Sequence, residues 1–159
     1  MNPRRTTIAA TVAAGMMALA GCQDSGAPYL ATEGGGFLFN YRLAEAYAQI
    51  VVGPPPKKTL PEGATIEVSF EDPAGGAPVV MQHEVTNPGQ LRYSFQTRPL
   101  QGIKADKPYA VTVRLIASDG GEMEKLDKTF VSNVDQSVLP KVAPVIGPGY
   151  ARNPAAAGQ

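Results

Sequence analysis

Apolar and polar residues alternate in short runs along most of this chain. The clearest run covers residues 65–71, where Ile66, Val68 and Phe70 alternate with polar neighbours. A period of two with one polar face is typical of a half-buried antiparallel strand. Comparable runs predict further strands at residues 79–85, 91–97, 109–115 and 123–132.

The connections between these runs predict how the strands are joined. Asn87-Pro88-Gly89 has Pro and Gly in the order of a type II turn, which predicts that residues 79–97 form a hairpin. The long return between residues 95 and 109 favours a crossing from one sheet to another. Residues 123–132 lose their alternation near residues 125–127, which indicates a bulge or a free sheet edge. Such an edge could add a strand to a partner.

The segment 37–52 is open to two interpretations. Alternation over residues 37–43 and again over 46–52 favours one long or two short strands. A helix over residues 43–49 is the alternative, because Ala-Glu-Ala-Tyr-Ala is good helix-forming sequence. The three consecutive prolines at residues 54–56 predict a loop over residues 54–58, since proline cannot donate to a sheet ladder.

Together these features predict an all-β fold. Six to eight short strands and frequent turn signals are typical of a single antiparallel β-sandwich of the immunoglobulin-like or Greek-key type, here placed at residues 37–136. Residues 22–36 are expected to form a flexible tether because they are small, polar and glycine-rich. Residues 137–159, rich in Pro, Gly and Ala, are expected to form an extended C-terminal arm with a disordered end, part of which could lie along the domain.

The N-terminal segment is typical of a secretory signal peptide. Arg4 and Arg5 precede a short apolar stretch at residues 8–20, which is too short to span a membrane. The stretch ends in Leu19-Ala20-Gly21-Cys22, which resembles the lipobox of bacterial lipoproteins. This resemblance implies cleavage after Gly21 and lipidation of Cys22. Several acyl chains would give a stable membrane anchor, whereas a single chain binds only marginally.

Charge and cysteine content narrow the range of functions. Removal of residues 1–21 leaves 138 residues, enough for one domain, with 12 basic and 14 acidic side chains and a formal charge of −2. This balance contains no basic excess and argues against nucleic acid as a partner. Cys22 is the single cysteine, so an internal disulfide is excluded.

No combination of residues in the sequence predicts catalysis. His83 is the single histidine, lies at a core-facing position of its run and has no evident catalytic companions. Two small acidic groups, one around Glu67 and one around Glu122, are better explained as a solvated strand face than as a calcium site. We therefore expect no enzyme activity, no cofactor and no metal. The residues most suited to contact a ligand or partner are Tyr47, Lys57, Lys58 and Tyr150.

Several short segments resemble the YbaY/YscW-type bacterial lipoprotein domain. These are Leu60 to Asp72, Leu91 to Phe95 and Lys107 to Val111, and the resemblance covers about residues 46–132. It implies a compact β-sandwich on an outer-membrane lipid anchor, facing the periplasm, although exposure at the cell surface is also possible. In the secretion branch of that family, such proteins are pilotins, which escort a secretin subunit to the outer membrane. The residue after the cysteine is Gln23 rather than Asp, which resembles the outer-membrane sorting signal of lipoproteins in enteric-type bacteria.

Two functions follow as hypotheses. The first is a cell-envelope lipoprotein, anchored through Cys22, whose non-catalytic β-sandwich binds or escorts another envelope protein. The alternative is an envelope lipoprotein that binds carbohydrate or another ligand through Tyr47 or the loop at residues 54–58.

Overall fold

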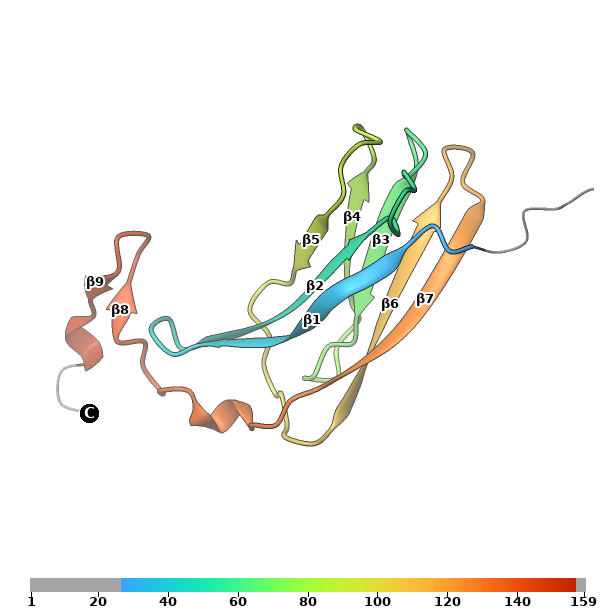
Figure 1. Cartoon of the computed structure of the whole chain (residues 1–159). Coiled ribbons are helices and arrows are strands. Elements are labelled where there is room, and N and C mark those ends of the chain that lie inside the picture. The colour runs from blue at the N-terminus through green and yellow to red at the C-terminus, as the bar shows by residue number, and fades with distance from the viewer. Residues whose placement is uncertain (1–26, 157–159) are drawn as a thin grey trace, which may run out of the picture.

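The computed structural model describes residues 27–156 and shows two antiparallel β-sheets packed face to face (Figure 1). Sheet A has the strand order β1 (Ala31–Asn40), β2 (Glu45–Gly53) and β5 (Tyr93–Gln96). Sheet B has the order β4 (Val79–Glu84), β3 (Thr65–Phe70), β6 (Pro108–Ile116) and β7 (Glu122–Val131). The predicted all-β sandwich is therefore confirmed, with seven strands in its two sheets.

Most of the core comes from the residues that the alternating pattern placed on one face. Every second residue of β3, namely Ile66, Val68 and Phe70, is buried, and so is every second residue of β6 from Tyr109 to Leu115. Sheet A contributes Ala46, Ala48, Ile50 and Val52 of β2, together with Tyr93 and Phe95 of β5. Because successive side chains of a strand point to opposite faces, one register fixes the whole set.

The predicted hairpin over residues 79–97 is wrong. β4 pairs along its whole length with β3, whereas β5 pairs with β2 in the other sheet. The turn itself forms, because Gln90 N–H donates to the Asn87 carbonyl at 3.0 Å. It joins two strands that lie in different sheets. Alternation and turn chemistry predicted both strands and the turn, but the strands' partners depend on residues far away in sequence.

The predicted crossing between residues 95 and 109 is confirmed, since it carries the chain from sheet A to sheet B. Tyr109, near the start of β6, is buried beside this crossing. Its hydroxyl accepts a hydrogen bond from Lys104 N–H at 2.8 Å and lies 3.4 Å from the Gly102 carbonyl. This arrangement matches the tyrosine corner of immunoglobulin-like sandwiches, in which a tyrosine binds backbone a few residues upstream.

Residues 37–52 form two strands rather than a helix, with a turn at residues 41–44. The Asn40 side chain holds this turn by accepting hydrogen bonds from Arg42 N–H and Leu43 N–H. Ala44 adopts a positive φ of 55°, which ends the turn. Burial alternates along β2, so Ala46, Ala48, Ile50 and Val52 face the core, as the period of a strand requires.

The predicted tether at residues 22–36 is too long. β1 begins at Ala31, so Gly34, Gly35 and Gly36 lie in a ladder with β2, after a register shift between Thr32 and Gly34. Gly35 is required there by packing, because a Cβ atom would lie 2.5 Å from Cζ of Phe130 and 2.9 Å from the Gln49 carbonyl oxygen. Glycines that suggest flexibility in isolation here permit close contact between the sheets.

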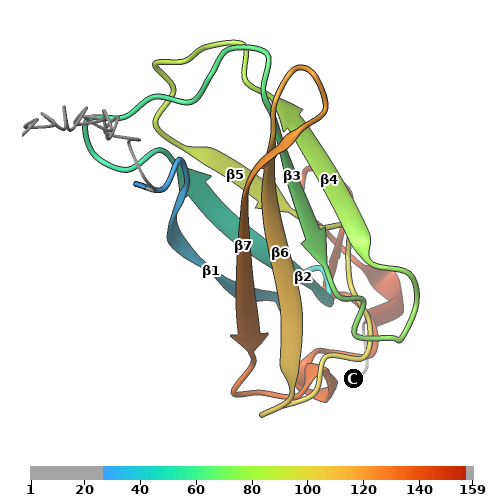
Figure 2. The same ribbon diagram turned by 90° about the vertical axis from the view of Figure 1, so that its right-hand side faces the viewer.

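β7 is an edge strand, as predicted, and a register shift lies at its start, opposite Leu115 and Ile116. Figure 2 shows β7 and β1 at the same side of the sandwich. Phe130 of β7 closes this side by packing edge-on against Phe37 of β1, with ring centroids 6.2 Å apart.

The C-terminal arm has more order than predicted. It contains the turns η1 (Gln136–Val138) and η2 (Pro154–Ala156) and a small hairpin of β8 (Val145–Ile146) and β9 (Ala151–Arg152). The arm runs along one end of the sandwich to the tip of the β1–β2 hairpin (Figure 1). Val145 N–H donates to the Arg42 carbonyl there at 3.2 Å.

Candidate functional site

A wide surface hollow lies at the tip of the β1–β2 hairpin, on the outer face of sheet A. We call it the tip hollow. It has a volume of about 460 Å³ and is wide open to solvent. Its lining residues are Leu38, Phe39, Asn40, Tyr41, Arg42, Tyr47 and Gln96. The mixture of phenol, amide and guanidinium groups with apolar side chains suits binding of a ligand or partner.

Tyr47 lines this hollow because it points away from the core between Ala46 and Ala48, which are buried. Its hydroxyl donates a hydrogen bond to the carboxylate of Glu45, two residues earlier on the same face. This hydrogen bond, with partial burial and the negative charge of Glu45, raises the pKa of Tyr47 to about 12. The phenol is therefore a neutral, oriented group at physiological pH.

The arm, which binds the hairpin tip through Val145 and Arg42, brings Tyr150 to the same end of the sandwich. Tyr150 lies close enough to Tyr47 for its phenol to contribute to the raised pKa of Tyr47. Its own side chain is half exposed, and its backbone φ is 52° in the turn between β8 and β9. Two of the four predicted contact residues, separated by about a hundred positions in sequence, thus lie at the same end of the sandwich.

The other two predicted contact residues lie at the opposite end of the sandwich. Lys57 and Lys58 belong to the loop after β2, beside the point where the described chain begins. Lys58 Nζ donates to the Ala27 carbonyl at 2.7 Å and lies 5.6 Å from the centre of the Tyr29 ring. These lysines form no common site with Tyr47. Gly21 and Cys22 lie outside the described residues.

A second, smaller and less open hollow continues along the outer face of sheet A. It has a volume of about 310 Å³ and is lined by Gly34, Gly35, Gly36, Phe37, Leu38, Gln49 and Val51. It shares Leu38 with the tip hollow, so the two form one surface along β1 and β2. Sequence reasoning found Tyr47 here but missed Leu38, Asn40 and Gln96. The alternation of residues 37–43 was the available signal for the two residues on β1.

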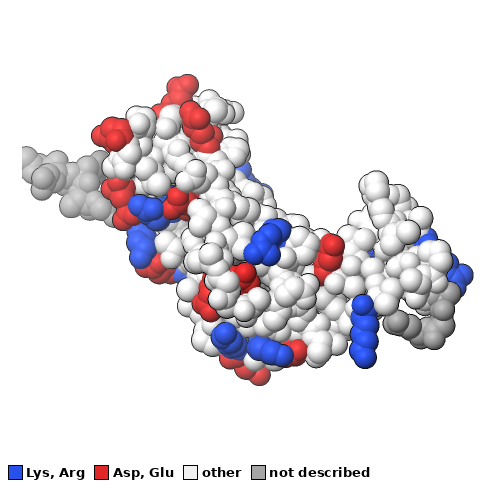
Figure 3. All heavy atoms as spheres, turned by 180° about the vertical axis from the view of Figure 1, so that it is seen from behind, with Lys and Arg blue, Asp and Glu red and all other residues white. Residues whose placement is uncertain are grey.

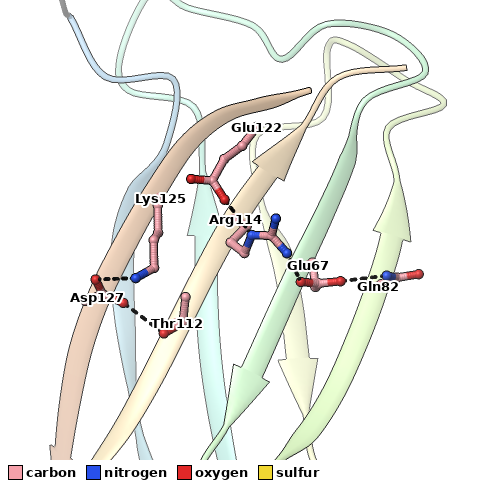
Figure 4. A network of polar contacts seen from close by, with 7 residues as sticks. All are labelled: Glu67, Gln82, Thr112, Arg114, Glu122, Lys125 and Asp127. Carbon is pink, nitrogen blue, oxygen red and sulfur yellow. Dashed lines mark hydrogen bonds and ion pairs between the residues drawn. The ribbon is translucent and has the colours of Figure 1, made fainter. Parts of the chain in front are cut away.

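The outer face of sheet B is a charged network (Figure 4). Arg114 of β6 lies between two carboxylates, with Nη1 2.8 Å from Glu67 of β3 and Nε 2.6 Å from Glu122 of β7. A hydrogen bond from Gln82, followed in strength by the one from Arg114, lowers the pKa of Glu67. On the same face, Lys125 and Thr112 lower the pKa of Asp127.

This network explains the two acidic groups of the sequence. Glu67 and Glu122 are bound to an arginine rather than directed at a common centre. Within residues 27–156, no three His, Cys, Asp or Glu side chains converge in a way that could hold a metal ion. Figure 3 shows acidic and basic side chains interspersed over one face of the molecule, and a surface that dips between the sandwich and the arm.

His83 lies on β4, at the side of the sandwich opposite β1. Its ring makes edge-on contacts with Tyr93 and Phe95 of β5, with centroids 5.2 and 6.5 Å apart. The side chain is exposed, although its position in the strand faces the core. These contacts close the gap between the two sheets, and they give His83 a packing role.

Comparison with known proteins gives only distant likenesses. No family model and no curated protein matches the chain. A family 76 glycoside hydrolase from a bovine Bacteroides thetaiotaomicron strain is similar in structure with a TM-score of 0.37 and 13% identity, over 64% of this chain and 20% of that chain. OgpA from Akkermansia muciniphila is similar with a TM-score of 0.35 and 15% identity, over 70% of this chain and 29% of that chain. The chain thus spans less than a third of either protein. No helix within the described part is long and apolar enough to cross a membrane.

Proposed function

We propose that this protein is a lipid-anchored lipoprotein of the bacterial cell envelope whose non-catalytic β-sandwich binds another envelope protein. The observation that carries the proposal is that the start of the described chain and the tip hollow lie at opposite ends of the sandwich. The described chain begins at Ala27, five residues after Cys22, whereas the tip hollow lies at the far end of β1. A domain held by one end would present its binding surface at the other.

The short distance from Cys22 to the domain supports this arrangement. Glu124 of β7 accepts hydrogen bonds from the backbone N–H groups of Tyr29 and Leu30, and Leu30 is buried. The chain is therefore fixed to the sandwich within eight residues of the proposed anchor. Five residues reach at most about 18 Å when fully extended, so the sandwich would lie close to the lipid surface.

The anchor is tested by Cys22→Ser. We expect this variant to lose incorporation of labelled fatty acid and to move from the membrane pellet to the soluble fraction. Ser25→Ala, which leaves the tetrapeptide before it intact, serves as the matched control and should stay in the pellet. If Cys22→Ser pellets and carries label as the unaltered protein does, the lipoprotein assignment is wrong.

The binding function is tested by a photo-crosslinking amino acid placed at Tyr47, in the tip hollow, and in parallel at Thr112, on the charged outer face of sheet B. In intact cells we expect a discrete protein adduct from position 47 and none from position 112. The same adducts from both positions, or none from position 47, would contradict a partner site on sheet A.

A second candidate is carbohydrate binding at the same hollow. The observation that favours it is that the hollow is lined by the aromatic side chains of Tyr41 and Tyr47 together with the amides of Asn40 and Gln96. Aromatic faces can stack on sugar rings, while amides bind hydroxyl groups. Screening the lipid-free protein against envelope glycans decides the matter: binding lost in Tyr47→Ala and Tyr150→Ala would support it. A flat response across all glycans would remove it.

A further inference from the structure

The free edge of β1 differs from the other long sheet edge of this molecule. β1 and β7 each contain ten residues and each is hydrogen-bonded on one side only. Five residues of β7 are charged, and exposed charge on an edge strand opposes pairing with other strands. β1 carries one charged residue, Glu33, at its register shift, and none from Gly34 to Asn40. Residues 34–40 also contain no proline.

This uncharged edge has no backbone partner within the described part of the chain. β2 occupies one side of β1, and no other backbone hydrogen bond involves residues 34–40. The segment just before β1 is not free, because the backbone N–H groups of Tyr29 and Leu30 donate to the Glu124 carboxylate. The open edge therefore starts after the register shift and continues to the turn at Asn40.

The side chains next to this edge are also incompletely covered. Phe37 and Phe39 pack against the core but remain partly exposed at the margin of the sandwich. On the opposite face, Leu38 is 45% exposed and lies between the two hollows. A strand added beside β1 would bury backbone groups and cover these three side chains together.

We propose that residues 34–40 of β1 are the docking site for an extended, uncharged peptide segment of the envelope partner, which adds a fourth strand to sheet A. Apolar residues at alternate positions of the segment would pack beside Phe37 and Phe39. A charged residue there would lose its hydration beside a neutral edge without gaining a counter-ion. The added backbone hydrogen bonds supply affinity, as in other cases of strand addition. The inference rests on the proposed function and names its binding surface.

A second copy of this chain fits the edge less well. Antiparallel pairing of β1 with its own copy would place the two N-terminal ends at opposite ends of the shared ladder. Ten residues of strand span about 33 Å, which exceeds the roughly 18 Å available between Cys22 and Ala27. Two anchored copies could pair in this way only by lying flat on the bilayer. A segment of a different protein has no such restriction.

The test begins with the whole protein in detergent and a library of random seven-residue peptides. We expect the selected peptides to be uncharged at their centre, with alternating apolar residues. Bound peptide should slow amide hydrogen exchange at alternate residues of the 34–40 segment. Leu38→Lys should weaken binding at least tenfold, and Val131→Lys, the equivalent change at an exposed position of β7, should leave it unchanged. Thermal unfolding of both variants confirms that they fold.

Three outcomes would overturn the inference. These are failure to select any peptide, protection of β7 or another segment in place of residues 34–40, and sedimentation of the free protein as a dimer whose residues 34–40 are already protected. None of these outcomes affects the fractionation of Cys22→Ser. Failure of the docking site is therefore distinguishable from failure of the lipoprotein assignment.

Discussion

Two tyrosines show how the same side chain acquires different roles from its position. Tyr109 is buried and binds backbone at the crossing between the sheets, so its hydroxyl serves the fold. Tyr47 points outward into the tip hollow, where its hydroxyl is oriented by Glu45. Strand alternation predicted the first as core and the second as exposed. Alternation could not predict the hydrogen-bond partner of Tyr109, because Lys104 N–H approaches the hydroxyl only when the crossing folds back.

Replacement of Tyr109 by phenylalanine should lower the free energy of unfolding by about 1–2 kcal/mol, because it leaves the partly buried Lys104 N–H without its partner. Urea denaturation measures the effect. Tyr41→Phe, which removes an exposed hydroxyl, is the matched control and should be neutral within a few tenths of a kcal/mol. Equal stability of both variants would show that the tyrosine corner contributes nothing.

The pKa of Tyr47, raised to about 12, gives a second prediction at this scale. Because the pKa is raised in the folded state, the associated stability is present below pH 10, where the unfolded phenol is still protonated. It is lost as the pH rises toward 12. Glu45→Gln should bring the pKa of Tyr47 back toward its usual value of 10, as followed by NMR of the ring. Glu33→Gln should not change it.

At the level of elements, β1 departs furthest from its sequence-based interpretation. Its glycines predicted a tether, yet they form the strand that closes one side of the sandwich beside Phe130. Local sequence could not reveal this, because the ring that requires Gly35 comes from a strand almost a hundred residues later. The free edge that remains is a consequence of strand order, which no local pattern specifies.

Gly35→Ala and Gly34→Ala form a matched pair that tests the role of β1. A Cβ at position 35 would overlap the Phe130 ring, so we expect destabilisation of about 1–3 kcal/mol. A Cβ at position 34 would meet no atom within 4 Å, so that variant should be neutral or slightly more stable. Thermal unfolding gives both values. Identical behaviour of the two variants would mean that residues 34–36 are not packed as a strand.

For the whole molecule, the most important feature is that the two ends of the sandwich differ in what they carry. The loop containing Lys57 and Lys58 lies with Ala27 at the end nearest Cys22, and the tip hollow and the arm lie at the other. An anchored domain should therefore stand with the first end toward the lipid. The arm then reinforces the far end, where its backbone binds Arg42.

A fluorophore on the lipidated protein in vesicles tests this orientation. Lys57→Cys and Tyr41→Cys each supply one free thiol, because the proposed lipidation would block the thiol of Cys22. With a quencher on the lipid head groups, we expect stronger quenching at position 57 than at position 41. Position 41 follows the far end of β1, and the ten residues of this strand span about 30 Å. Equal quenching at both positions would show that the sandwich lies flat.

The sequence by itself determined the class of fold, the buried face of almost every strand, the turns and the N-terminal Cys22 motif. These depend on side-chain period and on short-range chemistry, which adjacent residues carry. The tertiary structure alone decided that β4 and β5 lie in different sheets, that residues 31–36 form a strand and that the C-terminal arm reaches the tip of the β1–β2 hairpin. Each of these depends on contacts between residues distant in the chain, and such contacts are chosen by the packing of the whole sandwich.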